Sequence, residues 1–256
     1  MIVTADSPLV DEIVPSGSIE ERKRGLSPTI LLMHYTGLPT ASEAIDVLKD
    51  PKSKVSCHYV VDETGRVTQM VAEGMRAWHA GVSHWRGEED INSASIGIEI
   101  HNPGHDAGYP DFTDRQMRAV IALSQDIVAR HRIAPERILA HSDVAPSRKI
   151  DPGEKFDWRR LAADGLGHWV EPEPVRERDR GLGYGTAGPL VAEVQMMLRR
   201  YGYGVEVHGE LDQRTGFVLR AFQLHFRPAR VDGHIDQSTI TTLERLLAAL
   251  PAPLVA

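Results

Sequence analysis

Short apolar runs separated by polar turns mark the first 150 residues of the chain. Residues 29–34 form a continuous apolar run, which predicts a strand buried on both faces. Further runs predict strands at residues 58–61, 67–71, 95–100 and 137–141. These runs favour one central sheet.

Helical spacing of apolar residues occurs between the predicted strands. Residues 41–49 have this spacing, and residues 113–131 form the clearest helix. That helix opens with Thr113 and Gln116, a capping-box pattern. One of its faces carries Met117, Val120, Ile121, Ser124, Ile127 and Val128. Strands interleaved with helices predict an α/β domain, with a central, mostly mixed sheet flanked by helices.

The composition changes from His168 onward. Residues 168–183 are rich in proline and charge, which predicts a linker. Beyond it, residues 209–215 recur as residues 233–239, a shift of 24 positions, and each copy leads from a glycine turn into a helix. Helices predicted over 190–201, 217–226 and 240–250 form a small three-helix C-terminal domain, of a size at which a core is feasible.

Charge and cysteine content limit the classes of partner. The chain has 256 residues and a formal net charge of -7, which argues against nucleic acid because phosphate binding needs a basic face. Cys57 is the only cysteine, so no intrachain disulfide can form, as is usual in a reducing compartment. A monomer is the plain expectation.

The N-terminal sequence lacks a basic start followed by an apolar run, so no signal peptide is expected. No apolar stretch approaches the roughly 18 residues of a membrane span. A cytoplasmic location is therefore favoured, with the cell envelope as the alternative.

A candidate metal site comes from two predicted strand ends and one loop. His34 and His141 each end a predicted strand, and Asp151 lies in the loop that follows His141. Two imidazoles and one carboxylate are a sensible three-ligand set for a catalytic zinc ion, with the fourth position left for water. The alternative is a packed strand histidine beside a solvated loop, and spacing alone leaves both interpretations open.

Two charged residues strengthen the catalytic interpretation. Glu99 lies between two isoleucines in a predicted strand, where an unpaired buried carboxylate would be costly. It is therefore a candidate general acid or base. Lys149, two residues before Asp151, is a candidate for stabilising an oxyanion, although taken alone it reads as an exposed loop lysine.

Five strings in this region resemble the type-2 zinc N-acetylmuramoyl-L-alanine amidases. The strings are LLMHYTG, SCHYVVDETG, RAWHAGVSHWRG, SIGIEIHNPG and AHSDVAPSRKIDPG, and the run of matches covers about residues 28 to 160. The branch that cuts both anhydro- and ordinary muropeptides is the most similar. The resemblance implies hydrolysis of the amide between the lactyl group of muramic acid and L-alanine, in cell-wall turnover or recycling.

The resemblance also implies a role for each site residue. His34, His141 and Asp151 fall on the ligands of one zinc ion, Glu99 on the catalytic glutamate, and Lys149 on the lysine that supports the tetrahedral intermediate. The expected substrate contacts are Trp78, His79, His58 and Arg148, although His58 also suits a place in the core.

The C-terminal region resembles the peptidoglycan-binding repeat domain, through Ala221-Phe222-Gln223 and the turn at residues 232–236. His208 departs from that pattern, because the family usually has aspartate there. The expected domains are a zinc amidase domain at 1–167, with residues 1–27 as an N-terminal extension, the linker at 168–183, and a peptidoglycan-binding-like domain at 184–256. Alternatives are a non-catalytic peptidoglycan-recognition module and a zinc peptidase that cuts within the stem peptide.

Overall fold

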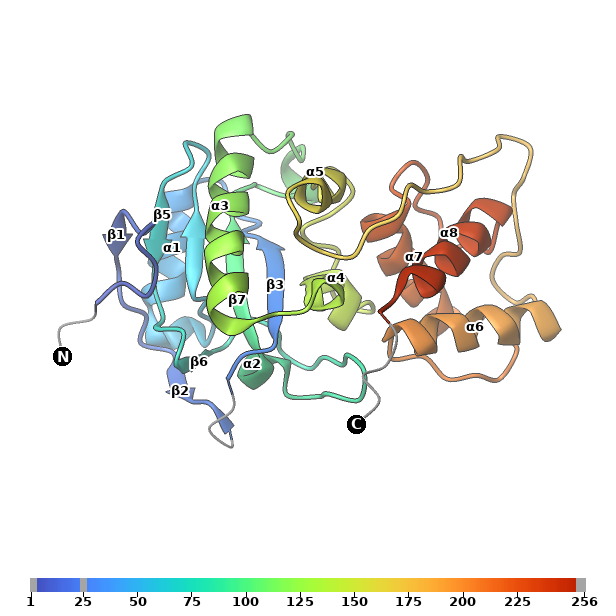
Figure 1. The fold of residues 1–256 in the computed structure, drawn as a ribbon, viewed down its shortest axis with the longest axis horizontal. Helices are drawn as coiled ribbons and strands as arrows, with labels where there is room; N and C mark the ends of the chain where they lie inside the picture. The colour runs from blue at the N-terminus through green and yellow to red at the C-terminus, as the bar shows by residue number, and fades with distance from the viewer. Residues whose placement is uncertain (1–3, 24–26, 252–256) are drawn as a thin grey trace.

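The computed structural model describes residues 4–23 and 27–251. Parts of the expected N-terminal extension, residues 1–3 and 24–26, and the end of the expected C-terminal domain, residues 252–256, lie outside these ranges. The C-terminal helices gather at one end of the molecule, beside the helices α4 (His141–Val144) and α5 (Trp158–Ala163) (Figure 1).

A six-stranded mixed sheet forms the centre of the larger unit, as predicted. Its order is β1 (Glu12–Ile13), β5 (Val67–Gln69), β4 (Tyr59–Val61), β7 (Ser95–Ile100), β3 (Ile30–Tyr35) and β8 (Ile138–Ala140). Only β4 and β5 pair antiparallel within it. A separate antiparallel pair, β2 (Ile19–Glu21) and β6 (Met75–Ala77), was not predicted from the sequence.

Helices cover both faces of the sheet (Figure 1). Helix α3 (Asp114–His131) packs on the face that carries Leu31 and Met33 of β3. Helix α1 (Ala41–Lys49) packs against Val60 on the other face. The remaining short helices are α2 (Ile91–Ala94), η2 (Pro51–Ser53), η3 (His105–Ala107) and η4 (Pro135–Arg137).

The predicted capping box of α3 is confirmed. The Gln116 amide donates to Thr113 Oγ1 at 3.1 Å, and the Thr113 amide donates to Gln116 Oε1 at 3.4 Å. The two bonds satisfy backbone groups that the first helical turn leaves unpaired.

Helices α6 (Pro189–Tyr201), α7 (Gln213–Phe226) and α8 (Gln237–Ala249) form the small helical domain. Helices α7 and α8 begin earlier than their apolar spacing predicted, because the repeated aspartates cap them. Asp212 accepts the Thr215 amide and Asp236 accepts the Thr239 amide, both at 2.7 Å.

The two units share one hydrophobic core. Ile30 and Leu32 of the sheet, together with Trp85, belong to the same buried cluster as Leu198 of α6 and Phe222 of α7. Helix α4 also packs against α7. Among the described residues, no helix is long and apolar enough to cross a membrane.

The buried residue Glu73 links α3 to strand β4. Its carboxylate accepts from the Tyr59 hydroxyl at 2.6 Å and from Arg130 Nη2 at 2.8 Å, and it contacts His131 Nε2 at 2.6 Å. Burial alone would raise the pKa of this carboxyl, but its bonds from Arg130, His131 and Tyr59 lower the pKa to about 2.

We expect these contacts of Glu73 to make stability depend on pH in the acidic range. The folded-state pKa of Glu73 lies below that of an unfolded glutamate, so the stabilisation is present above about pH 4.5 and is lost as pH falls toward 2. Glu73→Gln should remove up to about 3 kcal/mol of that pH-dependent free energy of unfolding. Urea unfolding at pH 6 and pH 3 measures it. Glu12→Gln is the control, because the Glu12–Arg66 pair is exposed; equal pH slopes in wild type and Glu73→Gln would refute the assignment.

Candidate metal centre and active-site cleft

The register of the sheet brings the candidate residues together. His34 on β3 lies directly opposite Glu99 on the parallel strand β7. Strand β8 flanks β3 on the other side and ends at Ala140, so that His141 begins α4 immediately beyond it. The site therefore lies at the carboxyl ends of parallel strands, where ligands of open α/β sheets usually bind.

Three buried side chains converge on one point. Nδ1 of His34 and Nδ1 of His141 are 2.9 Å apart, and Asp151 Oδ2 lies 3.2 Å from the first and 3.0 Å from the second. The three side chains are almost fully buried. Among the described residues, these are the three grouped closely enough to hold one metal ion.

The hydrogen bond on the far side of His141 determines which of its nitrogens carries the proton. Nε2 of His141 lies 3.2 Å from the carbonyl oxygen of Ala80, which can only accept, so Nε2 is the donor. A neutral His141 ring then directs the lone pair of Nδ1 at the Asp151 carboxylate. Two acceptors at 3.0 Å repel each other unless a cation lies between them.

A chain of hydrogen bonds gives His34 the same tautomer as His141, with the proton on Nε2. The Ser95 hydroxyl donates to the Ile91 carbonyl at 2.5 Å, so Ser95 Oγ accepts from His79 Nε2 at 3.3 Å. His79 Nδ1 is then an acceptor for His34 Nε2, 3.0 Å away. The lone pair of His34 Nδ1 therefore faces His141 and Asp151, as a metal ligand requires.

The charge states of the three side chains suit the binding of a cation. Burial, followed by the neighbouring His141, lowers the pKa of His34 to about 4, so the ring is neutral at pH 7. Asp151 adds a buried carboxylate to the two imidazoles. Two neutral imidazoles and a carboxylate fit a divalent metal ion.

Glu99 and Lys149 lie in the cleft that contains this triad. The cleft has a volume of about 420 Å³, and Trp78, His79 and Arg148 also line it. Glu99 Oε2 is buried and has no hydrogen-bond partner among the described residues. Burial and then the negative charge of Asp151 raise the pKa of Glu99 well above its usual value, and Lys149 opposes that rise.

The four expected substrate contacts occupy different places. Trp78 lines the cleft with a buried Nε1 that has no partner among the described residues, and Arg148 lines its rim. His79 supports His34. His58 is fully buried outside the cleft lining, and its Nδ1 accepts the Gly97 amide at 3.0 Å.

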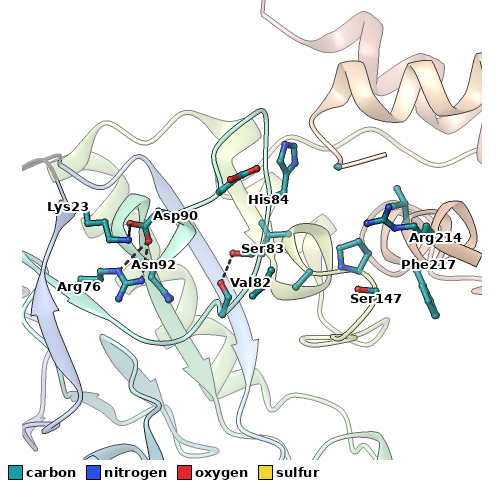
Figure 2. Close-up of a pocket in the computed structure, with 17 residues that line it drawn as sticks. Lys23, Arg76, Val82, Ser83, His84, Asp90, Asn92, Ser147, Arg214 and Phe217 are labelled. Carbon is teal, nitrogen blue, oxygen red and sulfur yellow. Dashed lines mark hydrogen bonds and ion pairs between the residues drawn. The ribbon is translucent and has the colours of Figure 1, made fainter. Parts of the chain in front are cut away.

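A larger cavity lies between the two units (Figure 2). Its volume is about 930 Å³, and Val82, His84 and Ser147 of the larger unit face Arg214 and Phe217 of α7 across it. None of the three triad residues lines it, and neither Glu99 nor Lys149 does. We therefore place the candidate active site in the smaller cleft.

Comparison with known proteins decides the family. Residues 24–154 match the N-acetylmuramoyl-L-alanine amidase family, and residues 187–243 match a peptidoglycan binding domain family. The chain belongs to the N-acetylmuramoyl-L-alanine amidase family. The resemblance predicted from the five sequence strings is thereby confirmed.

Two similar proteins align with more than half of this amidase. AmiD of Escherichia coli K12 is 39% identical over 232 residues, which cover 85% of this chain and 82% of AmiD. AmpD of Haemophilus influenzae is 33% identical over 165 residues, which cover 57% of this chain and 88% of AmpD.

Two solved structures resemble the whole fold of the amidase. The E. coli AmiD complex with anhydro-N-acetylmuramic acid-L-Ala-D-γ-Glu-L-Lys has a TM-score of 0.74 at 35% identity, and covers 90% of this chain and 92% of that chain. Pseudomonas aeruginosa AmpDh3 with anhydromuramic pentapeptide has a TM-score of 0.75 at 30% identity, and covers 91% and 96%.

The sequence analysis did not identify Gly97 and Ser95, which support His34 through His79. The amidase needs Gly97 in β7 because a Cβ there would lie 2.5 Å from His79 Nδ1. A glycine inside a strand is the sequence signal for such a close approach. Ser95 gave no comparable signal, because its role depends on where His79 lies.

We expect Gly97→Ala to weaken metal binding by the amidase. The added methyl must displace the His79 ring, which removes the acceptor for His34 Nε2. Disturbing such a supporting contact typically lowers metal affinity by about 10- to 100-fold. Competition for Zn²⁺ against a chromophoric chelator measures the change. Gly74→Ala is the matched control because a Cβ at Gly74 meets nothing within 4 Å; equal affinities in the two variants would contradict the role of His79.

Proposed function

We propose that this amidase uses zinc to hydrolyse the amide bond between the lactyl group of N-acetylmuramic acid, or its anhydro form, and L-alanine of the stem peptide. The observation that carries the proposal is the buried His34–His141–Asp151 triad with Glu99 beside it, whose Oε2 has no hydrogen-bond partner among the described residues. The substrate in the AmiD complex, anhydro-N-acetylmuramic acid-L-Ala-D-γ-Glu-L-Lys, supports the choice of bond, and cell-wall turnover or recycling is the setting that this reaction serves.

Nδ1 of His34, Nδ1 of His141 and Oδ2 of Asp151 would hold one zinc ion per chain. Their neutral and anionic states suit zinc, and three protein ligands leave a fourth position open. A zinc ion in such a site lowers the pKa of water from about 16 to about 7 and polarises a carbonyl group.

Glu99 then moves the protons. Its Oε2, which has no partner in the part of the chain that the structure describes, accepts a proton from the water that attacks the amide carbon. The C–N bond breaks, and Glu99 returns the proton to the leaving amine of L-alanine. The raised pKa of Glu99 suits both halves of this exchange, because the group can hold the proton between the two steps.

Lys149 stabilises negative charge on the former carbonyl oxygen. Lys149 lines the same cleft as Glu99 and His34, which supports this role. Such an electrostatic contribution is largest in a cleft that excludes most water.

We assign substrate contact to Trp78 and Arg148. The buried Trp78 Nε1 has no partner within residues 4–23 and 27–251, and a substrate acceptor could supply one. Arg148 donates to the carbonyl oxygens of Ala80, at 3.0 Å, and Val82, and so closes the rim of the cleft. His79 positions His34, and His58 packs behind the strand.

The proposed domain division follows these roles. Residues 1–167 would form the catalytic domain, with residues 1–27 as an extension, 168–183 the linker, and 184–256 the domain that holds peptidoglycan. A monomer stays a prediction. The net charge of -7 supports a partner other than nucleic acid.

The zinc content of the purified protein tests the proposal. We expect one zinc per chain by elemental analysis, and loss of hydrolysis after dialysis against a chelator, with recovery on adding Zn²⁺. A protein that bound muropeptide but held no metal would instead be a recognition module, and the proposal would be wrong.

A further inference from the structure

Asp143 lies between the candidate metal centre and the C-terminal helices. It occupies the first turn of α4, two residues after His141, and its side chain is completely buried. A buried carboxylate is stable only when its oxygens are paired, so its partners determine where this turn of α4 can lie.

Three donors satisfy the Asp143 carboxylate. Oδ2 accepts the backbone amide of Ala140 at 2.8 Å and contacts Nδ1 of His225 at 2.7 Å. Oδ1 accepts the hydroxyl of Tyr203 at 2.6 Å. Ala140 ends β8, whereas Tyr203 follows α6 and His225 lies on α7, so two of the three donors come from the C-terminal region.

Aromatic contacts fix the orientation of both C-terminal donors. The His225 ring stacks on Trp158 of α5, with centroids 3.7 Å apart and planes at 23°. The Tyr203 ring packs edge-on against Trp85, with centroids 5.0 Å apart. Rings held in this way have little freedom to follow Asp143 if α4 shifts, so the hydrogen bonds hold α4 in one place.

Helix α4 in turn sets the position of two metal ligands. His141 is its first residue, and the amide of Ser142 donates to the carbonyl oxygen of Asp151 at 3.0 Å. A displacement of this turn would therefore move one imidazole directly and the carboxylate through its backbone. Metal sites are sensitive to small misplacements of the ligands, which their supporting hydrogen bonds prevent.

We propose that Tyr203 and His225 are positioning residues of the metal centre, acting through Asp143 on His141 and Asp151. The C-terminal helical domain thereby completes the catalytic unit in addition to any contact it makes with peptidoglycan. The inference rests on the proposed function, since it takes the triad to be the zinc site.

Single-group substitutions test this inference in the full-length chain. Tyr203→Phe removes one hydroxyl, and His225→Phe keeps a ring for stacking but removes the donor. We expect each to lower the affinity for Zn²⁺ by about 10-fold or more, measured by competition with a chromophoric chelator. The absorption bands of bound Co²⁺ should shift, and kcat on a small muropeptide should fall while KM stays within about twofold.

Two further variants separate positioning from general stability. Tyr201→Phe is the matched control, because Tyr201 is equally buried but its hydroxyl bonds His168 Nδ1 at 2.9 Å instead of Asp143. It should retain wild-type zinc affinity and the wild-type Co²⁺ spectrum. His225→Asn can place an amide nitrogen where Nδ1 was, and it should recover most of the zinc affinity lost in His225→Phe.

The possible outcomes are distinct. If Tyr203→Phe and His225→Phe both bind Zn²⁺ as tightly as Tyr201→Phe, Tyr203 and His225 have no positioning role and this inference is wrong. If the wild-type chain shows no measurable affinity for Zn²⁺, the proposed function fails and this inference fails with it.

Discussion

Replacing Glu99 by glutamine should leave zinc bound and lower kcat by about 10²- to 10⁴-fold, the range that general acid–base catalysis contributes. The amide of glutamine matches the carboxylate in shape but cannot accept a proton from water. Because Glu99 is not one of the three converging ligand groups, the metal content should stay near one ion per chain. Turnover of a muropeptide and elemental analysis of the same sample measure the two quantities.

The pH profile gives this prediction a second readout. Glu99 must be deprotonated to act, and its pKa is raised by burial and by Asp151, so kcat/KM should rise with pH through a value above the ordinary 4.5 of glutamate. Asp106→Asn is the control, because Asp106 also lines the cleft but has no assigned part in proton transfer. Undiminished turnover in Glu99→Gln would show that another group moves the proton.

Replacing a proposed metal ligand should strongly reduce both zinc binding and hydrolysis. His141→Ala deletes one of the three proposed ligand atoms, Nδ1, which lies 3.0 Å from Asp151 Oδ2. We expect the affinity for Zn²⁺ to fall by more than the roughly 100-fold that supporting residues can cost, and hydrolysis to be lost at ordinary zinc concentrations. Calorimetric titration with Zn²⁺ and an activity assay at matched zinc concentration check both.

His101→Ala is the matched control for that experiment. His101 is nearly as buried as His141, but it lies outside the triad. It should keep one zinc and most of its activity. A His141→Ala variant that still bound one zinc with wild-type affinity would show that the metal lies elsewhere.

Local sequence patterns were sufficient for most of the sheet. The apolar run at residues 29–34 is long enough to identify β3, and the run at 95–100 identifies β7 in the same way. Strands β1, β2 and β6 have only two or three residues each and lie outside the apolar runs that marked the other strands. Their existence depends on pairing with distant segments.

The start of α4 shows how distant residues override a local pattern. The sequence predicted that a strand continues to His141, but the structure ends β8 at Ala140 and begins a helix at His141. The Asp143 carboxylate caps that turn, and its other partners, Tyr203 and His225, lie 60 and 82 positions further along the chain. No local window of sequence contains that information.

The candidate site was also predictable from the sequence only in part. Residue types and the place of Glu99 within an apolar strand pointed to the chemistry, and the five family strings then implied the complete set. The hydrogen-bond chain from His34 through His79 to Ser95 was not predictable, because it requires the loop that carries His79 to approach β7 at Gly97.

Digestion of a defined anhydromuramoyl tripeptide by the zinc-loaded protein, with the products identified by mass spectrometry, tests the proposed amide cleavage. We expect two fragments, anhydro-N-acetylmuramic acid and an intact tripeptide with a free L-alanine amino group, whose masses together exceed the substrate by one water. A peptide cut between its own residues, with the muramoyl–alanine bond intact, would contradict it.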